Sequence, residues 1–242
     1  MSFLERVDQS IRRSPVWRSI FRQPYPNDER SRAYAVMNNV FLHLHPVRVR
    51  QHAVKFAYTF CLGGLSFFLF LVLTVTGVYL MFFYVPSATM AYTNILDIQS
   101  EVPFGLLTRN IHRWAAHLMV FFVFLHMMRV FYHGAYKPPR EFNWVVGVVL
   151  LFLTIMLSFT GYLLPWDQIA YWAITIGSNF GSYFPIVNTP TRAILLGGLE
   201  VGQNTLLRFY VGHVIFLPLV AATFLAVHFW RIRKDGGISG PL

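Results

Sequence analysis

The sequence predicts an all-α membrane protein, built as a bundle of four transmembrane helices with an amphipathic surface helix at its N-terminus. Three observations lead to this fold class: the composition, four long apolar stretches, and basic residues that lie outside them. Of the 242 residues, 55% are hydrophobic and only 12% are charged, and the mean hydropathy is +0.49. A soluble domain carries about 25% charged residues, so the chain is too apolar to fold as one in water.

Four stretches are long enough to cross a bilayer, which takes about 20 apolar residues. They cover residues 56–85, 111–132, 144–164 and 209–230. The sequence therefore divides into a basic arm at 1–55, a four-helix domain at 56–232 and a short tail at 233–242. The longest connection, residues 165–208, is predicted to be a loop.

The distribution of basic residues predicts the orientation. Sixteen Lys and Arg lie in the arm, in the connection 133–143 and its flanks, and after the last apolar stretch, whereas four lie on the other side. Because basic loops stay on the cytoplasmic side, both termini are expected there and the connections 86–110 and 165–208 are expected outside. This topology also explains the net charge of +10 without nucleic acid, for which the chain has no basic-aromatic recognition module.

The N-terminal arm begins "MSFLERVDQSIRRSPVWRSIFRQPYP" and lacks the continuous apolar core of a secretory signal. Leu4, Val7 and Ile11 fall on one helical face, and Trp17 and nearby apolar residues extend that face. A basic amphipathic helix of this kind lies on an anionic membrane surface. A solvated basic arm is an equally good interpretation of the same residues.

Histidines recur at matched intervals in two of the apolar stretches. His112 and His126 are 14 residues apart in the second, and His213 and His228 are 15 apart in the fourth. At about 100° per residue, each pair returns to within about 40 to 60° of its starting direction, with a rise of about 21 to 22 Å. Each helix therefore places one His near each membrane surface, and the two helices run in the same direction.

Two facing helices of this kind would form two His–His sites stacked across the membrane. Axial His ligation is typical of haem iron, whereas zinc requires three or four ligands at one place. A transporter or scaffold whose histidines only form hydrogen bonds is the alternative from another class. The remaining histidines are interpreted as interfacial or hydrogen-bonded: His43, His45, His52, His117 and His133.

Glycines repeat the same interval in the other two apolar stretches. Gly63 and Gly77 are 14 residues apart, as are Gly147 and Gly161. Glycine allows a flat cofactor to approach the backbone closely, although small residues also serve ordinary packing of membrane helices. Together with the histidines, they predict four helices around two flat cofactors. The lone cysteine, Cys61, excludes an internal disulfide and a CxxC motif, and a buried free cysteine usually acts as a small apolar residue.

From residue 57 to the end, the chain resembles the cytochrome b family, specifically its short b6 type. The segments that carry the resemblance are "FCLGG", "NIHRWAAH", "LHMMRV", "KPPREFNWVVGVVL", "TGYLLPWDQIAYWA", "VGQNTLLRFYVGH" and "HFWRIRKDGGISGPL". The resemblance implies a four-helix haem-binding bundle. In it His112 and His213 ligate an outer, low-potential haem b, and His126 and His228 ligate an inner, high-potential haem b. Cys61 matches a cysteine that carries a third, c-type haem through one thioether.

The resemblance also implies roles for three arginines and an outer pocket. Arg109 and Arg113 partner the propionates of the outer haem or shape a quinol pocket, and Arg233 matches an arginine near the inner haems. The segment "PWDQIAYW" forms one wall of the quinol pocket, around Gly161, Pro165, Trp166 and Asp167. The stretch before the first apolar run, and the arm itself, depart from the short plant-type pattern, which leaves the inner quinone site open.

The implied activity is electron transfer from quinol to cytochrome c or plastocyanin. One electron goes to a Rieske iron–sulfur protein and the other crosses the membrane to an inner quinone, with coupled proton translocation. The family's Pro-Glu-Trp-Tyr motif is absent from the sequence, so a subunit IV-like membrane partner is expected, in a dimeric complex with a c-type cytochrome. A bacterial cytoplasmic membrane is favoured over a thylakoid. The alternative is a dihaem anchor of a quinone-linked dehydrogenase or hydrogenase.

Overall fold

The computed structural model describes residues 3–15, 17, 28–38, 51–182, 189–235 and 237–238. Within these residues the regular secondary structure is entirely helical, and four helices are long and apolar enough to cross a membrane. They are α5 (Leu62–Met81), α7 (Gly105–Tyr132), α8 (Glu141–Leu163) and a continuous helix, Gln203–Lys234. The predicted fold class is confirmed.

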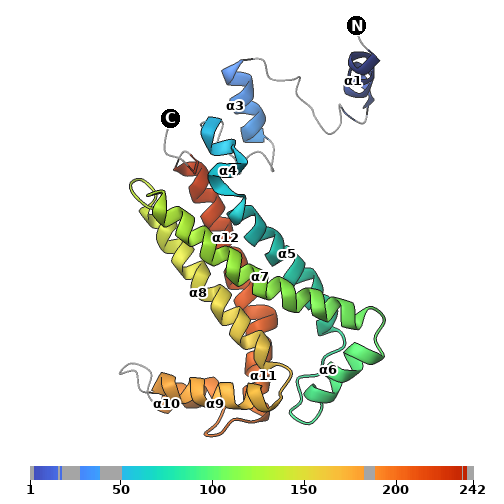
Figure 1. The fold of residues 1–242 in the computed structure, drawn as a ribbon, viewed down its shortest axis with the longest axis vertical. Coiled ribbons are helices and arrows are strands. Elements are labelled where there is room, and N and C mark those ends of the chain that lie inside the picture. Colours follow the sequence, from blue (N-terminus) through green and yellow to red (C-terminus); the bar gives the residue numbers. More distant parts are fainter. Residues whose placement is uncertain are drawn as a thin grey trace.

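The four long helices run alongside one another as a bundle (Figure 1). α5 packs along α7, α12 (Leu217–Lys234) packs along α8, and α7 also contacts α8. Buried Leu69, Ala115 and Met119 fill the contact between α5 and α7. Most of the other large apolar side chains on these helices remain exposed, as expected for a bundle whose outer surface faces lipid.

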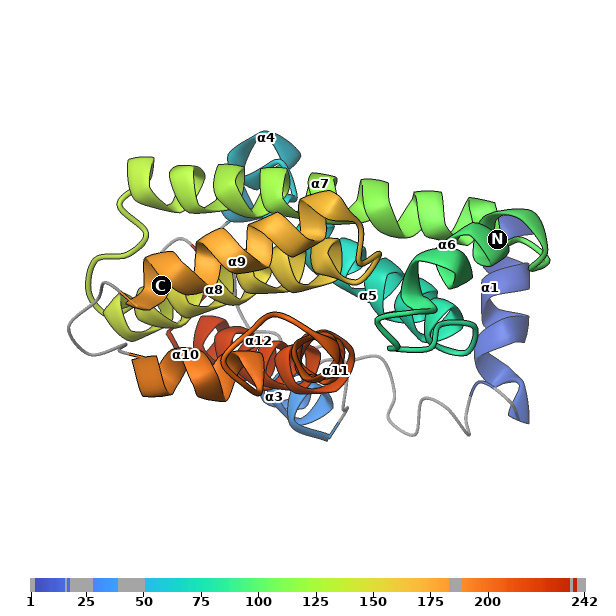
Figure 2. The same ribbon diagram turned by 90° about the horizontal axis from the view of Figure 1, so that it is seen from below.

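Shorter helices cover one end of the bundle, the end predicted to face outward. α6 (Ala91–Ser100) follows α5, and α9 (Gln168–Ser182) and α10 (Thr189–Leu196) lie across the end of α8 (Figures 1 and 2). Two buried clusters hold this cap together, one around Leu163 and Ile174 and one around Ile98 and Leu206. Trp166 packs against both clusters, so the turn between α8 and α9 joins the cap to the bundle.

Several element boundaries differ from those predicted. The apolar stretch 56–85 is divided into α4 (Phe56–Thr59) and α5, because Phe60 and Cys61 both adopt left-handed backbone angles, with φ of 49° and 52°. The second long helix begins at Gly105, six residues before the predicted start. The stretch 165–208 contains α9, α10 and the start of α11 (Gln203–Val211) and is therefore largely helical.

The last long helix contains a local change of winding. α11 continues into η3 (Gly212–Phe216), a single π-helical turn, and then into α12. The Leu217 N–H donates to the Gly212 carbonyl, five residues back. Pro218 follows directly and has no N–H to donate, so the irregular winding coincides with the proline that interrupts the normal ladder.

The N-terminal arm contributes α1 (Phe3–Arg13), α3 (Glu29–Asn38) and a short 3-10 turn, η2 (Gln51–Val54). Leu4, Val7 and Ile11 are exposed on α1, as the predicted apolar face requires. Contact of this face with a membrane surface stays a prediction. Two of the predicted interfacial histidines, His43 and His45, lie outside the described residues.

Candidate functional site

Two pairs of histidines face each other inside the bundle. The outer pair consists of His112 on α7 and His213 in η3, whose ring centroids are 6.4 Å apart. Each ring lies against a glycine of a neighbouring helix. A Cβ added at Gly77 would meet His112 Cε1 at 3.2 Å, and one added at Gly161 would meet His213 Cε1 at 2.5 Å. Only glycine lets the backbone come so near to these rings.

The residue before each of these glycines is a threonine that reaches the same ring. Thr76 Oγ1 lies 2.8 Å from His112 Nδ1, and Thr160 Oγ1 lies 3.1 Å from His213 Nδ1. The sequence analysis did not single out these hydroxyls, although both occur in a Thr-Gly dipeptide within an apolar helix. Such a dipeptide is the signal that would have identified them.

The inner pair consists of His126 on α7 and His228 on α12, and its ring centroids are again 6.4 Å apart. A Cβ at Gly63 would meet His126 Cε1 at 3.2 Å. A Cβ at Gly147 would lie 3.8 Å from His228 Cε1, which is ordinary contact. All four predicted glycines therefore face a predicted histidine, but with different tightness.

The π turn accounts for the equal separation of the two pairs. His112 and His126 are 14 residues apart on a regular helix, whereas His213 and His228 are 15 apart. A π turn bonds residue i to i+5 and so takes up one extra residue. With η3 directly at His213, the 15-residue interval advances about as far as 14 residues of α-helix, and the two rings of α11–α12 face those of α7 at both levels.

The residues present fit a haem at each level. Two metal–nitrogen bonds of about 2 Å each, plus the half-width of each ring, add to roughly 6 Å, and both pairs are separated by 6.4 Å. No group of three or more His, Cys, Asp or Glu residues gathers anywhere in the described part of the chain. A tetrahedral zinc site therefore has too few ligands here, whereas axial ligation by two His suits haem iron.

The structure places Cys61 at the break between α4 and α5, where its side chain is exposed. Gly63, two residues further on, contacts the inner His126. Arg129, one turn beyond His126, lies over the ring of Tyr58 at 4.5 Å, and its Nε donates to the Tyr58 carbonyl. The sequence analysis did not identify Arg129 as a site residue, although a charged side chain inside an apolar helix is a signal of function.

The three predicted arginines are separated in the structure. Arg109 is half-buried at the outer end of α7 and donates to Gln99 Oε1 at 3.2 Å. Arg113, one turn further along α7, is exposed. Arg233 is half-buried near the end of α12, at the opposite end of the bundle. Two of them therefore accompany the outer pair and one accompanies the inner pair.

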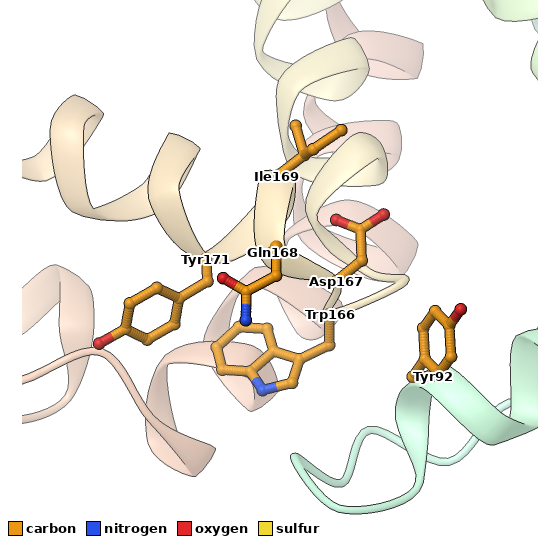
Figure 3. Close-up of a pocket in the computed structure, with 6 residues that line it drawn as sticks. All are labelled: Tyr92, Trp166, Asp167, Gln168, Ile169 and Tyr171. Carbon is orange, nitrogen blue, oxygen red and sulfur yellow. The ribbon is translucent and has the colours of Figure 1, made fainter.

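An open depression of about 590 Å³ lies at the outer end, where α6 faces the start of α9. Its lining includes Trp166 and Asp167 together with Tyr92, Gln168, Ile169 and Tyr171 (Figure 3). Figure 3 shows Tyr92 approaching from α6, across from the other five. Pro165 and Gly161 are half-buried just before this segment. Asp167 Oδ1 accepts a hydrogen bond from the Ala170 N–H at 2.8 Å, so it caps α9.

The fold and the two stacked histidine pairs define a class, the membrane-embedded four-helix haem-binding bundles. Comparison with known proteins identifies the family within it. The family model for cytochrome b/b6/petB matches residues 48–236. The chain is 48% identical to cytochrome b6 of Heliomicrobium gestii, over 76% of this chain and 85% of that protein. It is 46% identical to cytochrome b6 of Heliobacterium mobile, over 82% of this chain and 91% of that protein.

A solved structure described as a hyperthermophilic respiratory Complex III is also similar, with a TM-score of 0.68 and 32% identity. The match covers 76% of this chain, which spans about half, 49%, of the chain in that structure. The chain belongs to the cytochrome b/b6 family. It is an integral membrane protein of electron transport, and this family membership implies that it binds haem b.

Proposed function

We propose that this chain carries electrons across a membrane as the dihaem subunit of a quinol-oxidising Rieske–cytochrome b complex. The observation that supports this most directly is the pair of 6.4 Å His–His separations on the same four helices. His112 and His213 would hold the outer haem b, and His126 and His228 the inner one. Haem, when bound, supplies one-electron redox chemistry at each level; the chain's own residues fix where those levels lie.

At the outer end, the depression beside Trp166 and Asp167 is one wall of the proposed quinol site. Tyr92 and Tyr171 add aromatic surface to it, which suits a flat ring. Quinol would release two protons outside and two electrons, one to a Rieske protein and one towards the outer pair. Arg109 and Arg113 stand at this end of α7, where a guanidinium pairs well with a carboxylate such as a haem propionate.

At the inner end, Cys61 is the proposed attachment site of a third, c-type haem, close to an inner quinone site. Its exposure at the α4–α5 break and the neighbouring contact of Gly63 with His126 support this role. The test is haem staining of this chain on a denaturing gel. We expect a covalent signal that Cys61→Ala removes, while the two b-type haems persist. A wild-type chain without the stain would contradict the covalent haem alone.

The proposed partners follow from this role. A subunit IV-like membrane protein would supply the missing outer motif, a Rieske protein would take the first electron, and a c-type cytochrome would receive it. We propose a dimeric complex in a bacterial cytoplasmic membrane, with both termini of this chain in the cytoplasm. The distribution of 16 basic residues against four supports this orientation. The inner quinone would take up protons on the cytoplasmic side.

The experiment that tests the proposal is a reduced-minus-oxidised visible spectrum of the purified protein. We expect b-type bands from two components, with the outer one lost in His112→Ala and the inner one lost in His126→Ala. His117→Ala is the matched control, because His117 lies on the same helix but is exposed. Absence of any b-type band would refute the proposal. Co-purification with a Rieske protein would separate it from a dihaem dehydrogenase anchor.

A further inference from the structure

The two histidine pairs have the same ring separation but differ in what touches the rings. Both rings of the outer pair meet a threonine hydroxyl through Nδ1. In the inner pair, the residues before the contacting glycines are Leu62 and Val146, which have no hydroxyl. His228 Nδ1 is buried without a hydrogen-bond partner in the described part of the chain. The polar contact therefore distinguishes the outer level from the inner one.

The direction of the outer hydrogen bonds follows from the proton of each hydroxyl. Thr76 Oγ1 lies 2.7 Å from the Val72 carbonyl, four residues back on α5. A carbonyl oxygen only accepts, so the single hydroxyl proton is donated to it. The lone pairs of Thr76 Oγ1 are then left to accept the N–H of His112 Nδ1 at 2.8 Å.

The same arrangement recurs on α8. Thr160 Oγ1 donates to the Met156 carbonyl at 2.8 Å and accepts from His213 Nδ1 at 3.1 Å. Thr160 is buried, with 7% of its surface exposed, so water does not compete for these bonds. Two helices that are unrelated in sequence outside the Thr-Gly dipeptide thus treat the two outer rings identically.

We propose that Thr76 and Thr160 are positioning residues that hold both outer rings in the tautomer protonated at Nδ1 and lower the reduction potential of the haem bound there. A proton fixed at Nδ1 leaves the Nε2 lone pair for iron. A hydrogen bond donated from the far nitrogen also makes the ring a more basic ligand, which favours ferric over ferrous iron. The inference rests on the proposed function, because it assumes a haem between His112 and His213.

This asymmetry gives electron flow a direction. An outer haem whose two ligands are both made more basic is the easier one to oxidise, and an inner haem without these hydroxyl contacts is the easier one to reduce. The chain would therefore use two side chains on α5 and α8, neither of which touches iron, to bias transfer from the outer level to the inner one.

The test is a spectroscopic redox titration of the whole complex that resolves the two b-type midpoints. Thr76→Val and Thr160→Val replace the hydroxyl by a methyl group of similar size. Each is expected to raise the outer midpoint by up to about tenfold in the equilibrium constant, which is about 59 mV for a one-electron couple. The inner midpoint is expected to stay in place. Thr76→Ser and Thr160→Ser keep the hydroxyl and are expected to keep the wild-type midpoint.

Two threonines on the same helices serve as matched controls. Thr74 and Thr154 donate to carbonyls four residues back, at 2.8 and 2.9 Å, and neither hydrogen-bonds to a histidine in the described residues. Thr74→Val and Thr154→Val therefore lose the same helix contact and are expected to shift neither midpoint. Where a Val variant fails to assemble, Thr→Ala at the same position removes the hydroxyl without placing a methyl group against the ring.

The outcomes separate the two levels of the argument. A wild-type complex with two resolved midpoints, unchanged in the Val and Ala variants, would overturn the role of the hydroxyls and leave the haem sites standing. Equal shifts of both midpoints, or an equal shift in the Thr74 and Thr154 controls, would overturn it as well. A wild-type complex without b-type bands would instead overturn the proposed function on which the inference rests.

Discussion

Gly161→Ala is expected to displace the His213 ring and weaken binding of the outer haem. A Cβ at this position would lie 2.5 Å from His213 Cε1 and 3.0 Å from Nε2, the atom needed as ligand. Carbon atoms in favourable contact are about 3.5 to 4.0 Å apart, so the ring or the helix must move by about 1 Å. Overpacking of this kind costs about 1 to 3 kcal/mol, which corresponds to a loss of roughly 10- to 100-fold in haem affinity.

Gly147→Ala is the matched control, because it changes the same residue type on the same helix. Its added Cβ would lie 3.8 Å from His228 Cε1 and 3.6 Å from Met127 Sδ, both ordinary contacts. Alanine also favours a helix over glycine by about 1 kcal/mol, so this variant is expected to keep both haems. Gly63→Ala and Gly77→Ala, each with a contact at 3.2 Å, should fall between.

The assay is haem content per polypeptide, from the pyridine haemochrome spectrum, together with a redox titration that shows which b component is lost. Circular dichroism confirms that each variant remains helical. The reasoning would be refuted if Gly161→Ala retained both components at wild-type content. It would equally fail if Gly147→Ala lost as much haem as Gly161→Ala, since the ranking comes from the four contact distances and not from glycine itself.

Three further perturbations test other parts of the structure. Asp167→Ala removes the acceptor that caps α9 and should cost about 1 kcal/mol of stability, seen as a lower thermal midpoint; no change would contradict the cap. Tyr84, beyond the end of α5, has a pKa raised above 10.0 by burial and by nearby Tyr210. Its stabilising contribution is therefore complete below about pH 10 and is lost as the pH rises further. Tyr84→Phe should flatten the decline of the thermal midpoint above pH 10, and an unchanged decline would assign it to other groups. Deletion of Ile215 should convert the π turn to regular α-helix and retain both haems, whereas deletion of Phe121 on α7 rotates one His by about 100° and should lose one; equal haem loss would refute the spacing argument.

The parts of the site that were predictable from sequence are those that depend on helical periodicity alone. The four histidines and four glycines share one interval, and a regular helix converts an interval into a face and a depth. The bundle and the His–Gly contacts followed from that conversion. The tightness of each contact did not follow, because it depends on how closely two helices approach. No spacing indicates that Gly161 is far more crowded than Gly147.

The features that were missed arise from local departures from regular winding and from tertiary contact. Phe60 and Cys61 take left-handed angles without being Gly or Asn, so no residue type marked the break that exposes the cysteine. The hydroxyls of Thr76 and Thr160 look like ordinary helix residues until the facing ring is in place. Both kinds of feature concern geometry between elements, to which a one-dimensional pattern is blind.

The π turn shows how such a departure can complete a pattern that periodicity left unequal. On regular helices, intervals of 14 and 15 residues would leave the four rings misaligned by about 100° at one level. The observed pairs are equally separated at both levels, so the extra residue must be absorbed between His213 and His228. The π turn at Gly212–Phe216 is the place in that helix where the winding widens, and Pro218 already weakens the regular ladder there. The 15-residue interval and the proline are therefore two parts of one device, which sets the direction of His213 against Gly161.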